Sequence, residues 1–423
     1  MSNTDRQHDV VVWGATGVAG RLVAEYLTEQ YTPDTLSLAI GGRDESRLQA
    51  IEAEVVGRSD EWETLPIVLG DATEPETLRA MARDAHVVCT TVGPYTKYGT
   101  PLVEACVEAG TDYCDLTGEV NWTREMIDQY HDAAVDADAR IVHSCGFDSV
   151  PADLGTLLAQ SFAMAEFGTP CTRARIYLES GSGGVSGGTL ASAAELFEAA
   201  SNDPEVRAVL GNPYSLAPSG ERTGVDTGEQ RLPRKDPLRP CWTAPSPMAP
   251  VNERVVRRSN ALLDYPWGRG FRCTEVVPTG PGVGGAASAS LVSGGIGLFT
   301  LAMSVGPTRS ALKRFVFPDP GEGPSEEEME NGRFRVRVRG QGTNEDGPFT
   351  VDAVVGADRD PGYGATARML GESAMCLLED DTDSPLSGGI LTPASAIGEP
   401  LAERLRTIGF TASASEATAD VDA

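Results

Sequence analysis

Three glycines near the start of the chain have the spacing of a phosphate-binding loop. They occur as Gly14-Ala-Thr-Gly17-Val-Ala-Gly20, after an apolar run typical of a strand and before a helical pattern. In such a loop the first glycine allows a tight turn, the second lets a pyrophosphate approach the backbone, and the third permits close helix–strand packing. The helix N-terminus offers unpaired N–H groups to the phosphates. The spacing predicts a dinucleotide site, with Thr16 and Val18 beside the glycines.

The residues after the second predicted strand distinguish NADP from NAD. An NAD site has a carboxylate there for the ribose 2′-hydroxyl, whereas an NADP site has a cation for the 2′-phosphate. The sequence has Arg43 at this position and Arg47 a helical turn later, while Asp44 stands where a helix N-cap is expected. We therefore predict NADP(H), with NAD as the alternative. Asp71 is predicted to accept a hydrogen bond from the adenine amine, because Thr73 is expected to cap the next helix.

A glycine–proline turn at the end of the fourth predicted strand precedes residues that can donate protons. Gly93 and Pro94 are predicted to bring the backbone close to the nicotinamide ribose. Tyr95, Lys97 and Tyr98 follow and are the predicted catalytic residues, since they can supply a proton or orient a carbonyl. The alternative is that they line the rim of a loop. The Tyr-x-x-x-Lys spacing of short-chain dehydrogenases is absent around them, so that acid–base machinery is not assumed.

Polar residues also follow the fifth and sixth predicted strands. Asp115 lies at the end of the fifth, Glu119 comes just after it, and Asp148 comes after the sixth. Ligands collect at the carboxyl edge of an open parallel sheet, so these carboxylates either bind substrate or hold loops. Thr117 and Ser149 are expected to be helix caps.

These residues need a framework of alternating strands and helices. Val18, Leu22 and Tyr26 recur at i, i+4 and i+8, as on one face of a helix. Such alternation predicts an α/β fold whose residues 1–150 form an NAD(P)-binding Rossmann domain with a doubly wound parallel sheet. The predicted strands are Val10–Trp13, Leu36–Ile40, Leu65–Leu69, His86–Val92, Thr111–Leu116 and Arg140–Ser144.

The pattern changes after the first domain. Residues 151–360 are predicted to form a second α+β domain, for substrate binding or oligomerisation, that contains a mixed or antiparallel sheet. Within it Arg333–Arg339 alternates apolar side chains with four arginines, which we expect to be solvated or paired with carboxylates. Residues 361–410 are predicted to be closing helices that pack back on the Rossmann domain. Residues 411–423 are predicted to be a disordered acidic tail.

One long segment carries no charge. No charged residue occurs from Val276 to Thr308, although 23% of the chain is charged. We favour a buried helix and glycine loop at a domain or subunit interface, which would suit a homodimer. The alternative is peripheral membrane contact through residues 276–314, because Arg309, Lys313 and Arg314 follow the apolar stretch at once.

Composition limits the function further. The formal charge is −28, with 34 Lys+Arg against 62 Asp+Glu in 423 residues. That acidity argues against nucleic-acid binding, which needs a basic face. High acidity and only three lysines suggest a cytosol rich in salt, a halophilic setting. The eight cysteines form no CxxC pair, so we expect reduced thiols, no metal site and a cytoplasmic location, with the inner membrane face as an option.

Several longer motifs occur along the chain in a fixed order: GATGVAG, TTVGPYTKYG, VEACVEAGTDYCDLTGE, GFDSVPADLG, SGGT, RRSNALL, PGEGPSEEEME, DPGYGATARML and GGILTPASAIG. Together they resemble the saccharopine dehydrogenase-like oxidoreductases, in the branch of the trans-acting enoyl reductases. The resemblance covers about residues 10–410 and implies an N-terminal NAD(P)-binding Rossmann domain, a second α/β domain and closing helices that rejoin the first domain.

The resemblance implies an NADP(H)-dependent oxidoreductase that reduces a carbon–carbon double bond of a lipid-like or acyl substrate. The expected partner is a small, apolar molecule. One alternative is an amino-acid or imine substrate, as for the saccharopine enzymes proper. Another is a nucleotide-binding, membrane-associated scaffold without turnover.

Overall fold

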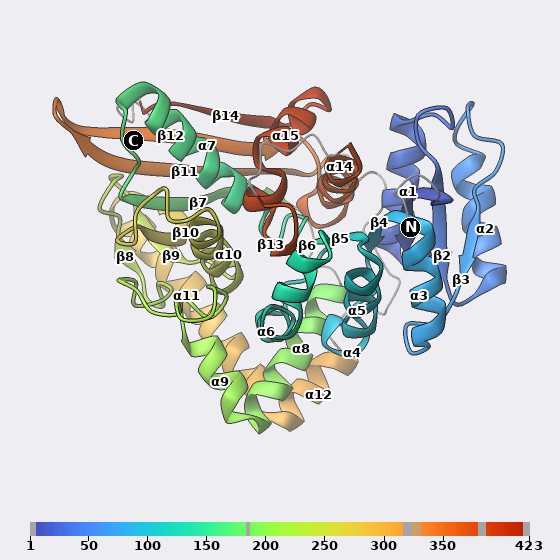
Figure 1. Ribbon diagram of the computed structural model, residues 1–423. Coiled ribbons are helices and arrows are strands. Elements are labelled where there is room, and N and C mark those ends of the chain that lie inside the picture. The colour runs from blue at the N-terminus through green and yellow to red at the C-terminus, as the bar shows by residue number, and fades with distance from the viewer. Residues whose placement is uncertain are drawn as a thin grey trace.

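Two seven-stranded sheets form the framework of the protein (Figure 1). The structure is a computed structural model that describes residues 6–182, 187–315, 325, 327, 329, 331–379 and 386–417. Most of the PGEGPSEEEME motif and the last six residues of the predicted tail lie outside the described residues.

The first sheet is parallel throughout, in the order β13-β6-β5-β4-β1-β2-β3. Val10, Val11 and Val12 of the central strand are fully buried, as expected where helices cover both faces. The strand order reverses between β1 and β4, which is where such sheets bind dinucleotides. This confirms the Rossmann-type α/β fold. The strands are β1 (His8–Trp13), β2 (Leu38–Gly42), β3 (Ile67–Leu69), β4 (Ala85–Thr90), β5 (Asp112–Asp115), β6 (Arg140–Val142) and β13 (Gly389–Leu391).

Helices connect the strands of this sheet. Their ends carry ordinary signals: Pro101 lies in the first turn of α5, and Gly110 ends that helix with φ of 61°. The helices are α1 (Val18–Gln30), α2 (Glu45–Val56), α3 (Pro75–Asp84), α4 (Tyr95–Tyr98), α5 (Thr100–Ala109) and α6 (Val120–Asp136).

The second sheet is mixed, in the order β14-β12-β11-β7-β10-β9-β8, with β7 and β10 parallel and the other pairs antiparallel. The arginines of β11 are paired with carboxylates: Arg337 with Glu179, and Arg339 with Asp352. The strands are β7 (Arg173–Ser182), β8 (Arg234–Lys235), β9 (Trp242–Pro245), β10 (Arg272–Gly280), β11 (Arg333–Asn344), β12 (Gly347–Ala357) and β14 (Thr411–Glu416).

The end of the chain joins both sheets. Strand β13 adds a seventh strand to the first sheet beside β6, and β14 extends the second sheet beside β12. The prediction of disorder from residue 411 is therefore wrong for Thr411–Glu416, where Ala412 is buried and the small alternating residues pair with β12. The connecting elements are a π-helix (Pro361–Ala365), α14 (Thr366–Glu379) and α15 (Pro393–Thr407).

A buried carboxylate ties three segments together at the junction of the sheets. Asp153 lies on α7 (Val150–Phe167), which packs on the second sheet and against α15 and α10. It accepts hydrogen bonds from the Ser259 hydroxyl at 2.6 Å and from the Ala394 N–H at 2.8 Å. Ser259 also lies 2.6 Å from the Thr392 hydroxyl. Three of the quoted motifs therefore meet here and hold the architecture.

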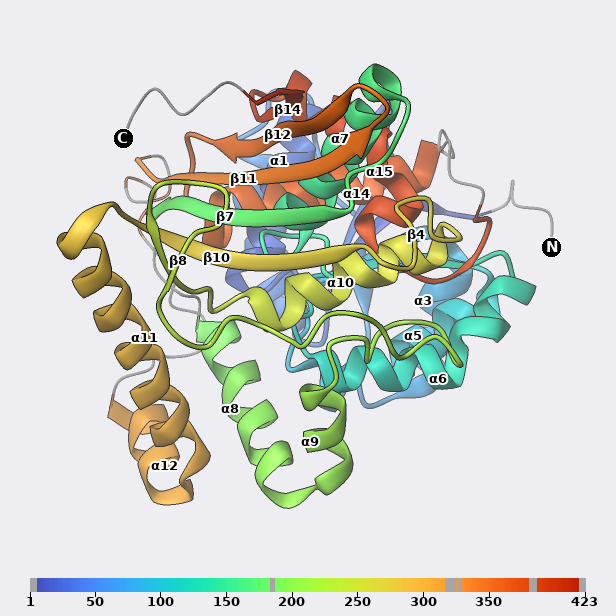
Figure 2. The same cartoon turned by 90° about the vertical axis from the view of Figure 1, so that its left-hand side faces the viewer.

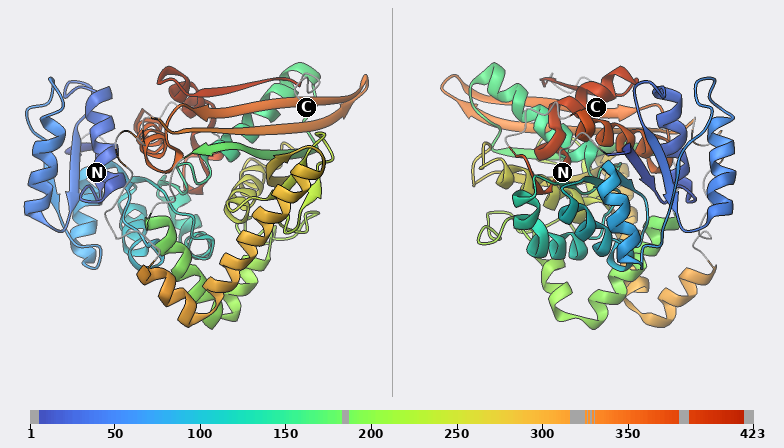
Figure 3. Two further views of the ribbon diagram at one scale, coloured as in Figure 1. Left: turned by 180° about the vertical axis from the view of Figure 1, so that it is seen from behind. Right: turned by 45° about the vertical axis from the view of Figure 1, so that its right-hand side comes forward.

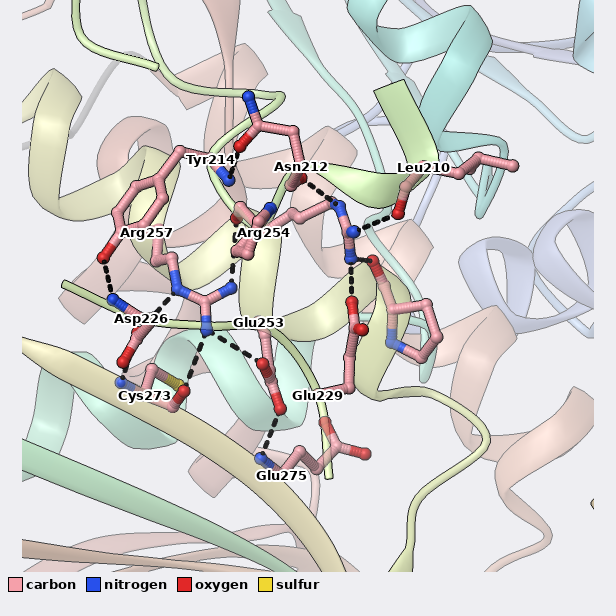
Figure 4. A network of polar contacts seen from close by, with 12 residues as sticks. Leu210, Asn212, Tyr214, Asp226, Glu229, Glu253, Arg254, Arg257, Cys273 and Glu275 are labelled. Carbon is pink, nitrogen blue, oxygen red and sulfur yellow. Dashed lines mark hydrogen bonds and ion pairs between the residues drawn. The ribbon is translucent and has the colours of Figure 1, made fainter. Parts of the chain in front are cut away.

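Two arginines of α10 (Ala249–Leu262) anchor the long connection before it (Figure 4). Arg257 donates to Asp226 at 2.8 Å and to Glu253 at 2.8 Å. Arg254 pairs with Glu229 and donates to the Leu210 carbonyl at 2.6 Å. Both arginines are buried, so these contacts fix the connection firmly although it is poor in regular structure.

Two pairs of helices project from the body (Figure 2). They are α8 (Gly187–Asn202) with α9 (Pro204–Gly211), and α11 (Gly282–Ser304) with α12 (Gly306–Phe315). The uncharged segment forms α11, and the favoured prediction of a buried helix is wrong within this chain. Leu291 is 78% exposed and Leu298 is 68% exposed. Helix α11 packs against β9 and β10 near its start and then projects away from the body, so the core covers little of its remaining length.

Candidate functional site

The glycine loop forms an open cradle at the end of β1. Gly14 has φ of 94°, and a Cβ atom there would lie 2.7 Å from Val92 Cγ2. A Cβ on Gly20 would lie 2.3 Å from the Gly14 carbonyl oxygen. Gly17 is exposed and occupies the N-cap of α1, where no side chain caps the helix. The turn thus requires glycines and leaves N–H groups free for an anion, so the residues fit the pyrophosphate of a dinucleotide.

Other predicted residues adjoin this cradle. Thr16 and Val18 are half-buried on either side of Gly17. The contact between Gly14 and Val92 also places the loop against the end of β4, next to Gly93. Gly93 is exposed and Pro94 is half-buried. Two neighbouring strand ends therefore meet at one continuous edge.

The side chains after β2 favour a 2′-phosphate. Arg43 and Arg47 are exposed. Asp44 is occupied by its role as N-cap of α2: it accepts the Arg47 N–H at 3.1 Å and the Ser46 hydroxyl at 2.9 Å. These hydrogen bonds lower the pKa of the Asp44 carboxyl. One oxygen of the carboxylate that would bind a ribose hydroxyl is thus used by the helix, while Arg43 is exposed beside it.

Asp71 is less free than the sequence suggested. The N-cap of α3 is Glu74, not Thr73, because Pro75 begins the helix. Thr73 instead donates to Asp71 Oδ1 through its N–H at 2.8 Å and its hydroxyl at 2.7 Å. The expected cap at Thr73 is therefore wrong. Because Oδ1 accepts both hydrogen bonds, the predicted contact of Asp71 with the adenine amine would involve Oδ2, and it stays a prediction.

Tyr95 is not placed to donate a proton to a substrate. Its side chain is 5% exposed and stacks on Trp122, with ring centroids 5.4 Å apart. Its hydroxyl donates to the Thr90 carbonyl at 3.2 Å and accepts the Leu116 N–H at 3.1 Å. Burial, together with the charge of Asp115, raises the pKa of the phenol well above 10. The prediction of a catalytic Tyr95 fails on this geometry, because an apolar stacking partner was not visible in the sequence.

Lys97 and Tyr98 lie closer to solvent, and Lys97 contacts a projecting helix. The Lys97 ammonium is 3.0 Å from Glu195 of α8, a hydrogen bond that raises the pKa of Lys97. Tyr98 is half-buried. Ser192, one turn before Glu195, donates to Glu119 at 2.8 Å. Helix α8 therefore packs over this edge, and no motif in the sequence signals the contributions of Ser192 and Glu195.

Glu119 and Asp115 hold loops. Buried Glu119 accepts the N–H groups of Tyr95 at 2.9 Å and Thr96 at 2.8 Å. Asp115, fully buried, accepts hydrogen bonds from the N–H groups of Thr117 and Ser144, the Tyr113 hydroxyl and His143. Among the two roles left open for these carboxylates, the described contacts favour loop support.

The two predicted caps behave differently. The Thr117 hydroxyl accepts the Glu119 N–H at 3.1 Å, but the N-cap of α6 is Glu119, so the expected cap at Thr117 is wrong. Ser149 occupies the N-cap position of α7 without a side-chain cap bond, and its hydroxyl donates to Asn252 at 2.9 Å. Ser149 therefore links the end of β6 to α10.

Asp148 differs from its neighbours. It is half-buried, and no other described residue donates a hydrogen bond to its carboxylate. A Cβ on Gly118 would lie 3.9 Å from Oδ1, and one on Gly146 would lie 3.2 Å from Oδ2, so glycines line the carboxyl group. Burial raises the pKa of Asp148 to about 7, and the charge of Asp115 adds to the effect.

Comparison with known proteins shows to which family the chain is similar. The family model for the saccharopine dehydrogenase NADP-binding domain matches residues 10–142. A trans-acting enoyl reductase of Mycobacterium ulcerans is 40% identical over 98% of this chain and 99% of that protein. A trans-acting enoyl reductase of Mycobacterium tuberculosis is 37% identical over 97% of this chain and 98% of that protein.

A solved structure shares the overall fold. Saccharopine dehydrogenase (L-Glu forming) from Saccharomyces cerevisiae matches with a TM-score of 0.55 and 13% identity, covering 97% of this chain and 100% of that one. At this identity the likeness concerns the fold alone.

Proposed function

Because the chain belongs to the trans-acting enoyl reductases of the saccharopine dehydrogenase-like family, and is an NADP-dependent oxidoreductase, we propose that it reduces a carbon–carbon double bond of an acyl or lipid-like substrate. Near-full-length similarity to proteins named for enoyl reduction carries this proposal. The open glycine cradle and the exposed Arg43 support NADPH as the donor, which supplies hydride when bound.

Electrostatics at the edge of the first sheet favour this substrate over an amino diacid. Glu119 and Asp148 place carboxylates at the ends of β5 and β6, and Lys97 is already paired with Glu195. A substrate with several carboxylates would meet the negative charge of Glu119 there, and Lys97 is not free to neutralise it. An uncharged acyl chain avoids this repulsion. Among the predicted catalytic residues, Tyr98 and Lys97 remain candidates for orienting a carbonyl.

The test is oxidation of NADPH by the purified protein. We expect turnover with trans-2-enoyl N-acetylcysteamine thioesters and a gain in kcat/KM as the chain lengthens from C4 to C12, because each added CH₂ group buries apolar surface. Glutamate with 2-aminoadipate semialdehyde, or lysine with 2-oxoglutarate, should give no turnover. If the protein oxidises NADPH with these pairs of amino acid and carbonyl compound but with no enoyl thioester, the imine alternative replaces the proposal. NADPH binding without any turnover would favour a scaffold.

We also propose that α11 and α12 contact a lipid surface. One described helix, Gly282–Ser304, is long and apolar enough to cross a membrane. An 18-residue stretch of it has a mean hydropathy of 1.5, and 11% of that stretch is buried. Its 23 residues span about 35 Å. Basic residues follow it directly, as suits a helix at an anionic surface. A second copy of the chain is the competing occupant.

Vesicle flotation tests the lipid contact. Leu298→Glu should lose binding to vesicles of phosphatidylglycerol and phosphatidylcholine, because the charge would enter the apolar layer. The matched control is Leu232→Glu, whose leucine is 67% exposed on a different surface, against 68% for Leu298. If Leu298→Glu instead converts a dimer to a monomer in light scattering, α11 is a subunit interface and the lipid proposal is wrong.

A further inference from the structure

One carboxyl group at the edge of the first sheet has no structural task. Asp115, Glu119 and Asp153 each accept several hydrogen bonds and hold loops or helices in place. The Asp148 carboxylate receives no hydrogen bond from any other described residue. Burying a carboxylate without partners costs free energy, and such groups concentrate at functional sites. Its position therefore needs an explanation other than packing.

The backbone around Asp148 is fixed although its side chain is free. On one side, the Phe147 N–H donates to the Thr366 hydroxyl at 3.1 Å. On the other side, the Ser149 hydroxyl donates to Asn252 at 2.9 Å. Asn252 in turn donates to Glu275 at 2.7 Å. Contacts from α14 and α10 thus hold the turn from both sides, as catalysis requires of a group that must meet a reacting atom.

Two glycines lie beside the half-buried carboxyl group of Asp148. Gly118 and Gly146 line its two oxygens, so no side chain of these residues covers the carboxyl group. Asp148 follows β6, two strands from β4 in the sheet, on the same edge as the exposed Gly93. Nicotinamide rings bind beyond the carboxyl ends of the strands on this side of the switch point.

We propose that Asp148 is the proton donor of the reduction, an assignment that rests on the proposed enoyl reductase function. In this step the Asp148 O–H bond breaks and its proton forms the C–H bond at the carbon next to the substrate carbonyl. The β carbon receives the hydride that NADPH supplies, so the double bond is reduced and NADPH is oxidised. Asp148 is left as a carboxylate and regains its proton from solvent.

The protonation state suits this role. Burial raises the pKa of Asp148 to about 7, so a large fraction of the carboxyl is protonated near neutral pH. The titratable groups that face it are Asp115, whose negative charge raises this pKa further, and Tyr95, whose phenol stays neutral. Lys97 is held by Glu195, and the Tyr95 hydroxyl is sealed in the core, so neither competes as donor.

Two measurements test the assignment, and the first needs neither cofactor nor substrate. Infrared difference spectra between pH 5 and pH 9 should show a carboxyl that titrates near pH 7 in the wild-type protein and is missing in Asp148→Asn. Asp148→Glu should restore a titrating carboxyl. If wild type and Asp148→Asn give the same spectra, Asp148 is ionised throughout and the proposal is wrong.

The second measurement follows trans-2-dodecenoyl N-acetylcysteamine reduction. Asp148→Asn should lower kcat by about a hundredfold or more and keep the Kd for NADPH within about twofold, with partial recovery in Asp148→Glu. The pH profile of kcat/KM should lose its decline above pH 7. A loss in Tyr98→Phe with none in Asp148→Asn would overturn the proposal. If the wild-type protein reduces no enoyl probe, the proposed function fails, while the spectra still decide the protonation of Asp148.

Discussion

Replacing Arg43 by alanine should convert a protein that prefers NADPH into one that hardly distinguishes the two cofactors. The Arg43 guanidinium is exposed after β2, while the neighbouring carboxylate of Asp44 is used to cap α2. A hydrogen bond to a charged group contributes about 1.5–3 kcal/mol. Solvent screens an exposed site, so we take the lower half of this range. The Kd for NADPH should therefore rise by about 10- to 50-fold.

The assay is calorimetric titration of the purified protein with NADPH and with NADH. Binding of NADH should change by less than about twofold, since NADH lacks the 2′-phosphate. Arg234→Ala is the matched control, because Arg234 is also exposed but lies on β8 of the second sheet. Raising the salt concentration should reduce the difference between wild type and Arg43→Ala.

Equal weakening of NADPH and NADH would refute the assignment of Arg43 to the 2′-phosphate. Asp44→Ala adds an independent check. It should lower the free energy of unfolding through loss of the N-cap, without changing the ratio of the two affinities. A selective loss of NADH in Asp44→Ala would show that this carboxylate binds the ribose.

Two further substitutions and a labelling experiment probe the packing of the protein. Gly20→Ala should weaken NADPH binding more than tenfold, because its Cβ would lie 2.3 Å from the Gly14 carbonyl oxygen, whereas Gly211→Ala, in open space, should have no effect in the same titration. Burial raises the pKa of Asp153 to about 6, so its contribution to stability is greatest below about pH 4 and is lost as pH rises to about 6. In Asp153→Asn, the free energy of unfolding measured by chemical denaturation should therefore depend less on pH between about pH 4 and pH 6. Of the eight thiols only Cys241 is not buried, so Ellman's reagent should label about one thiol in the native protein and all eight after denaturation; rapid labelling of several native thiols would contradict this packing.

Local signals in the sequence predicted part of the cofactor half of the site. The glycine spacing predicted the turn, and the 2.3 Å from a Gly20 Cβ to the Gly14 carbonyl oxygen is a steric requirement that acts over a few residues. Asp44 caps α2 as expected, which is also a local interaction, while the binding of a 2′-phosphate by Arg43 stays a prediction.

The catalytic half was harder to predict, since it depends on contacts between distant segments. Tyr95 was a plausible donor until Trp122 and the Thr90 carbonyl enclosed it. Lys97 is paired with Glu195, almost a hundred residues later, so it is less free to donate a proton than its residue type suggested. Residue type shows what a side chain can do, but its exposure depends on which segments pack against it.

The sequence by itself determined the Rossmann sheet, the glycine cradle and the preference for a 2′-phosphate, because periodicity, turn geometry and capping act between near neighbours. Only the tertiary structure decided which carboxylates are consumed as supports and that α11 stands exposed. It also added β13 and β14 to the two sheets. These outcomes depend on long-range pairing and burial, in which a side chain's partners come from segments far along the chain. Asp148 is the clearest case. Contacts of Phe147 and Ser149 hold the turn, while no other described residue donates a hydrogen bond to the Asp148 carboxylate.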